Sequence, residues 1–126
     1  MSAPLTFVSP PLGFEPLVDF SLDNIEGANG LYALKAVGAG DLRIFVIDAA
    51  VHLPAYAPTI SDEQGESIGL ASPDEASVLV VVNPTEEPTT VNLMAPIVVN
   101  NRTGQAHQFI LDDQGWPIRE PLVPAA

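Results

Sequence analysis

The sequence contains no cysteine, so it has no disulfide framework, no thiol nucleophile and no cysteine-bound zinc. It also has only four basic residues against sixteen acidic ones, and the resulting formal charge of −12 repels phosphate backbones and anionic lipid surfaces. We therefore expect no direct binding to nucleic acid or to membranes. The acidic surface either keeps the protein soluble or serves to attract a basic protein partner.

Long apolar runs are also absent. No stretch approaches the roughly 18 residues that span a bilayer, and the N-terminus lacks the basic and apolar regions of a secretory signal. Hydrophobic residues nevertheless make up 47% of the chain, which is too apolar for a disordered protein. Because the sequence shows no internal repeat or break in composition, we expect one cytoplasmic, monomeric domain that covers residues 1–126.

Prolines and short apolar runs determine the expected fold. Thirteen prolines are spread along the chain, and they nearly exclude long helices because proline lacks the backbone donor that a helix interior needs. Between them lie runs with the length and composition of β-strands, at 5–8, 18–22, 31–37, 42–48, 78–82, 91–94, 97–100 and 106–111. Turns containing glycine and asparagine separate several runs, which favours antiparallel hairpins.

Two of these runs restrict the architecture further. Residues 44–47 and 78–82 are apolar on both faces, so neither run fits a sheet that has one face in water. A small closed barrel or a tightly packed sandwich meets this demand.

One short helix is predicted at 61–70. Ser61 and Gln64 have the spacing of a capping box, and the two acidic residues between them suit the positive end of a helix dipole. A further helical turn is predicted at 72–75, where proline follows a serine that is suited to cap it.

Residues suited to catalysis or metal binding are few. His52 and His107 are the only histidines, and the sequence has no His-Glu-x-x-His spacing. A metal site would need a third ligand such as Asp48 or Asp112. Asp48 and His52 lack the Gly-x-Ser-x-Gly motif that would supply a nucleophile, and no phosphate-binding glycine motif occurs. The sequence therefore predicts no metal and no cofactor.

Two acidic pairs follow apolar runs. Glu86 and Glu87 stand between two prolines and are interpreted as a solvated hairpin loop. Asp112 and Asp113 precede Gln-Gly and are interpreted as a turn. Adjacent side chains in an extended segment point in opposite directions, which disfavours paired acid–base chemistry at the second pair.

The segment VNLMAPIVVN at 91–100 is similar to the most recognisable stretch of the FliW family of bacterial flagellar assembly factors. Other similar segments follow the family's order: LGFE at 12–15, FVID at 45–48, QFILD at 108–112 and WPIREPL at 116–122. Three positions depart from the family pattern, because Ala49 replaces a proline, Ala55 an acidic residue and Glu120 a histidine. The resemblance covers nearly the whole chain.

This resemblance implies a non-enzymatic, all-β protein, a small antiparallel barrel-like domain with one short helix. It further implies binding to the RNA-binding carbon storage regulator CsrA, relief of its repression of flagellin translation, and binding to flagellin itself. Because CsrA proteins carry basic surfaces, the charge of −12 has a use beyond solubility. On this basis the partner-binding residues are predicted to be Glu86, Glu87, Asp112, Asp113 and Glu120.

Two alternative functions remain open at this point. One is a small hydrolase that uses Asp48, His52 or Asp112, which requires a concave pocket with carboxylates of shifted pKa. The other is a chaperone for flagellin alone, without any RNA-binding regulator.

Overall fold

The computed structural model describes residues 2–11, 13–25, 27, 30–38, 43–53, 56–83, 89–111 and 114–121. Its strands are β1 (Ser2–Phe7), β2 (Asp19–Asn24), β3 (Leu31–Ala36), β4 (Arg43–Asp48), β5 (Ala76–Asn83), β6 (Thr90–Asn100), β7 (Gln105–Gln108) and β8 (Glu120–Pro121). Between β4 and β5 lie the helices α1 (Ala49–His52) and α2 (Asp62–Ser67) and the 3₁₀ turn η1 (Pro73–Glu75). The predicted β-barrel fold is confirmed.

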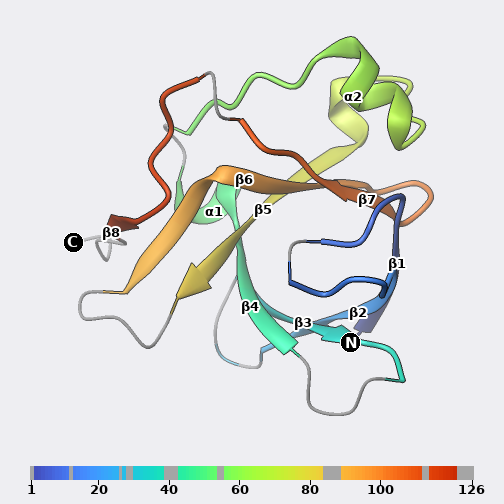
Figure 1. Cartoon of the computed structure of the whole chain (residues 1–126), viewed down its shortest axis with the longest axis horizontal. Coiled ribbons are helices and arrows are strands. Elements are labelled where there is room, and N and C mark those ends of the chain that lie inside the picture. Colours follow the sequence, from blue (N-terminus) through green and yellow to red (C-terminus); the bar gives the residue numbers. More distant parts are fainter. Residues whose placement is uncertain are drawn as a thin grey trace.

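Strands β1 to β7 form a closed barrel (Figure 1). Consecutive strands are antiparallel neighbours all the way from β1 to β7. A parallel pair of β1 with β7 closes the ring, so the antiparallel prediction is correct except at this one pair.

Gly104 allows β1 and β7 to approach each other. Its φ is +81°, and a Cβ atom at this position would lie 2.9 Å from the carbonyl oxygen of Pro4. Its own carbonyl oxygen accepts a hydrogen bond from the Thr6 N–H at 2.9 Å. A larger residue would therefore strain the backbone and push apart the two strands that complete the barrel.

Strand β6 bends sharply between the two runs that were predicted as separate strands, 91–94 and 97–100. Leu79 pairs with Ile97 and Val81 pairs with Asn92, so the four residues 93–96 of β6 lie opposite the single residue Val80. This large bulge contains Pro96 and turns the strand at a corner of the barrel. The two strands predicted at 91–94 and 97–100 are therefore one bent strand.

Three apolar clusters account for the strands with two apolar faces. The first fills the barrel and includes Phe7, Phe20, Leu34 and Ile97. The other two lie outside the barrel on the β4–β5–β6 side, one around Val80, Val91 and Leu93 and the other around Ile68, Val98 and Phe109. The segment from α1 to η1 and the C-terminal segment cover most of this outer face, so the prediction that residues 78–82 do not lie in a sheet with one face in water is confirmed.

The helices agree only partly with the sequence prediction. The capping box of α2 is present, because the Gln64 N–H donates to Ser61 Oγ at 3.1 Å and the Ser61 N–H donates to Gln64 Oε1 at 2.8 Å. The helix ends at Ser67, three residues before the predicted end. Helix α1 and strand β8 were not predicted, since four-residue and two-residue elements leave almost no periodic signal.

Candidate partner-binding surface

Asp48 and His107, two of the residues considered for catalysis or metal binding, have structural partners instead. Asp48 caps α1, since its Oδ1 accepts the Ala50 N–H at 2.9 Å. The His107 ring lies against Phe109, with ring centroids 4.5 Å apart, and its Nδ1 is 3.3 Å from Ser67 Oγ. Burial lowers the pKa of His107 below its ordinary value. Within the described ranges, no three histidine, aspartate or glutamate side chains gather into a metal site.

The bend of β6 is held by donors that do not belong to β5. The carbonyl oxygens of residues 93, 94, 95 and 96 accept hydrogen bonds, in that order, from Tyr56 Oη (2.6 Å), Leu111 N–H (2.7 Å), Gln108 Nε2 (3.2 Å) and Phe109 N–H (3.0 Å). A buried carbonyl without a donor is costly, so these bonds make the bulge a defined structure rather than a weak point.

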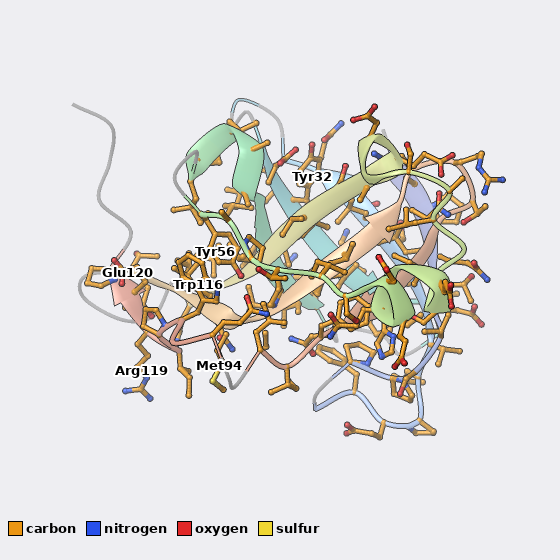
Figure 2. All side chains as sticks on the ribbon, turned by 90° about the horizontal axis from the view of Figure 1, so that it is seen from above. Tyr32, Tyr56, Met94, Trp116, Arg119 and Glu120 are labelled. Carbon is orange, nitrogen blue, oxygen red and sulfur yellow. The ribbon has the colours of Figure 1, made fainter. Side chains whose placement is uncertain are left out.

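Tyr56 and Trp116 join the two segments that cover the outer face. Their rings meet edge to face with centroids 4.7 Å apart, and Figure 2 shows both side chains beside the bend of β6, near Met94. Burial raises the pKa of Tyr56 to about 12. Gln114 adds a second connection, because its side-chain amide both accepts from the Thr59 N–H at 2.9 Å and donates to the Thr59 carbonyl at 2.8 Å.

A groove follows the outer face of β5. The extended segment 56–61, here called the strap, crosses β5 and β6 on its way to α2 (Figure 2). Two pockets, of about 540 and 430 Å³, lie along it and share the lining residues Pro58, Ala76 and Val78. The larger pocket is further lined by Ile60, Leu70 and the carboxylates Asp62 and Glu66. The outer face of the barrel thus offers an apolar floor with an acidic rim.

The chain matches the family described as FliW protein over residues 2–122. The chain belongs to the FliW family. It is similar to proteins named flagellar assembly factor FliW from Syntrophus aciditrophicus (31% identical over 114 residues; 89% of this chain and 72% of that protein) and Leptospira biflexa (31% over 122 residues; 94% and 80%). A third such protein, from Clostridioides difficile, is 31% identical over 114 residues, which are 89% of this chain and 88% of that protein.

The fold is also that of a solved FliW structure. A crystal structure of the flagellar assembly factor FliW superposes with a TM-score of 0.86 over 96% of this chain and 86% of that one, at 24% identity. Since the FliW family is a non-enzymatic group of flagellar assembly factors, the hydrolase alternative built on Asp48, His52 and Asp112 is excluded.

The structure places only one of the predicted partner-binding residues of this FliW-family chain. Glu120 lies half-buried in β8, opposite Val91 of β6. Glu86, Glu87, Asp112 and Asp113 lie outside the described residues, so they remain predictions. No helix among the described residues has the length and hydropathy needed to cross a bilayer.

The groove has no signature of its own in the sequence. The capping box predicted α2 and an apolar run predicted β5, but no local pattern indicates that Pro58 and Ile60 lie over Val78 and Val98. The only available signal was Val78 itself, an outward-facing residue in a strand whose two faces are both apolar.

Proposed function

We propose that this FliW-family protein is a cytoplasmic partner switch that binds a CsrA-type translational regulator and flagellin in turn. When flagellin is exported and scarce, the protein binds the regulator and relieves its repression of flagellin translation. When flagellin accumulates, it takes the place of the regulator. The observation that carries this proposal is the match to the FliW family along residues 2–122.

The charge of the molecule supports a basic partner. The net charge is −12, and two of the four basic side chains are already paired, Lys35 with Asp23 at 3.1 Å and Arg102 with Glu75 at 2.9 Å. Excess negative potential attracts a positively charged protein and raises its association rate. An RNA-binding regulator carries such a positive surface because it neutralises phosphates.

Direct binding to the regulator tests this proposal. The CsrA homologue of the source bacterium is mixed with the purified protein on a size-exclusion column, and the same mixture is then tested for release of a flagellin leader RNA from the regulator. We expect a complex and loss of RNA binding. Binding to flagellin without binding to the regulator would instead indicate a chaperone for flagellin alone.

A further inference from the structure

The floor of the groove is an apolar surface that the fold leaves partly uncovered. Val78 pairs with Val98 across β5 and β6, and both side chains line the larger pocket. Val98 belongs to the outer cluster around Ile68, whereas Val78 is half-buried and lies outside all three clusters of the described residues. Burying the exposed part of this floor under a partner would be favourable, at about 25 cal/mol per Å² of apolar area.

The rim of the groove carries negative charge on one side. Asp62 and Glu66 are four residues apart on α2, so their side chains lie on the same face of the helix, and both line the larger pocket. Glu63 is also exposed on the same helix but does not line the pocket. No lysine or arginine of the described residues lines either pocket, so the rim has no counter-charge of its own.

The walls of the groove are fixed before any partner binds. The buried side chain of Asn100 donates to the Ile68 carbonyl at 2.8 Å, and Arg102 donates both to Glu75 at 2.9 Å and to the Gly69 carbonyl at 3.2 Å. These bonds hold the segment after α2 against the β6–β7 turn. A preformed site loses little conformational entropy on binding, which favours affinity.

We infer that this groove binds a short segment of the proposed basic regulator, in which an apolar side chain enters between Ile60 and Leu70 and a lysine or arginine pairs with Asp62 and Glu66. The inference rests on the proposed function, because the proposed regulator is the partner that supplies positive charge. An apolar anchor in a pocket with charged neighbours at the rim is the usual composition of an energetically important contact.

Two charge reversals on α2 form a matched pair that tests the inference. Glu66→Lys places a positive charge on the rim of the groove, whereas Glu63→Lys makes the same change outside it. Both variants lose the same amount of long-range attraction, so only a local contact distinguishes them. We expect Glu66→Lys to weaken regulator binding about ten-fold more than Glu63→Lys by calorimetry, since an attractive pair becomes a repulsive one.

A third variant fills the groove without touching its charge. A Cβ atom at Gly65 would make ordinary contact with Leu70 at 3.8 Å, so Gly65→Met is accommodated in the helix and places its side chain at the larger pocket. We expect this variant to unfold at the same or a higher temperature and to keep its flagellin binding, while it loses regulator affinity about ten-fold or more.

The outcomes separate this inference from the proposed function. If the wild type binds the regulator, and Glu66→Lys and Gly65→Met bind it with unchanged affinity, the groove is not the binding site but the partner switch stands. If the wild type itself fails to bind the regulator, the proposed function is wrong and this inference is wrong with it.

Discussion

At Tyr56 a single hydroxyl group connects the strap to the bend of β6. It donates to the Leu93 carbonyl at 2.6 Å, and the ring packs against Trp116. Burial raises the tyrosine pKa to about 12 from an ordinary value of 10.0, because the charged phenolate is poorly solvated there. The protonated side chain is therefore part of the folded structure.

Tyr56→Phe is expected to destabilise the protein by about 1–2 kcal/mol, since it leaves the Leu93 carbonyl without its donor. The raised pKa also predicts a pH dependence. The contribution of the protonated Tyr56 to the free energy of unfolding is complete below pH 10. It is lost as the pH rises from 10 towards 12, because the unfolded chain releases the proton more readily than the folded one. Urea unfolding between pH 8 and pH 11.5 measures both effects, and an identical loss of stability at high pH in the variant would contradict this role of Tyr56.

Gly65 and Gly104 give opposite predictions for the same substitution. Gly65 is helical and its Cβ atom would meet only Leu70 at 3.8 Å, so Gly65→Ala is expected to stabilise the protein by about 0.5–1 kcal/mol. Gly104 has a φ of +81° and a Cβ there would lie 2.9 Å from Pro4, so Gly104→Ala is expected to destabilise it. Thermal unfolding of both variants checks the pair, and equal shifts in the two melting temperatures would contradict these opposite roles.

At the level of elements, the outer layer is held by polar contacts as much as by apolar ones. Segment 68–75 is bonded to the turn between β6 and β7 by Asn100, Arg102 and Glu75, and the Asn101 N–H donates to the Glu75 carbonyl at 2.8 Å. The pKa of Glu75 is lowered by its hydrogen bond from the Ala71 N–H and by Arg102. These bonds hold the segment after α2, whose Leu70 lines the larger pocket, against the barrel.

Asn100 and Arg102 are expected to contribute very differently. Asn100 is fully buried, and Asn100→Ala leaves the Ile68 carbonyl and the Arg102 N–H without partners, which costs about 2–3 kcal/mol. The Arg102 side chain is 57% exposed, so Arg102→Ala costs less than about 1 kcal/mol. Chemical denaturation of the two variants measures the difference, and a larger loss for Arg102→Ala would reverse this assignment.

The elements that the sequence predicted correctly are those with a strong local signal. The capping box at Ser61 and Gln64 predicted α2, and the apolar run 78–82 predicted a strand with protein packed on both faces. The features that the sequence did not predict depend on contacts between distant residues. No periodic pattern within a short segment indicates which distant segment it will contact. This applies to the parallel pairing of β1 with β7, the crossing of the strap over β5 and the pairing of β8 with β6. The groove is built from these distant contacts and was missed for that reason.

At the level of the whole molecule, a closed barrel carries an asymmetric outer layer. Helix α2 and strand β8 lie on opposite sides of the molecule (Figure 1). The strap runs over β5 and β6 towards α2 (Figure 2). The barrel closes on itself through β1 and β7, so strands β1 to β7 leave no open end of the sheet for a partner strand to extend. The net charge of −12 acts on the approach of a partner to any part of it.

The charge predicts a salt-dependent association rate. Steering of this kind changes association rates by roughly 10 to 1,000-fold and is screened over a Debye length of about 10 Å at 0.1 M salt. Regulator binding is therefore expected to slow as salt rises, and replacing Asp112 and Asp113 by lysine is expected to slow it further. Stopped-flow measurements across a salt series test this; a rate indifferent to both changes would remove any role for electrostatic steering.

Competition between the two proposed partners tests the central claim most directly. A standard interface takes roughly 800 Å² per partner, so area alone does not exclude a ternary complex, and overlap or coupling between the sites must do so. Flagellin is titrated into a preformed complex with the regulator on a size-exclusion column. At flagellin concentrations of about 100 times its Kd, complete exclusion predicts release of the regulator and about 100-fold weaker apparent binding, a cost near 2.7 kcal/mol. A stable ternary peak with unchanged regulator affinity would contradict the switch.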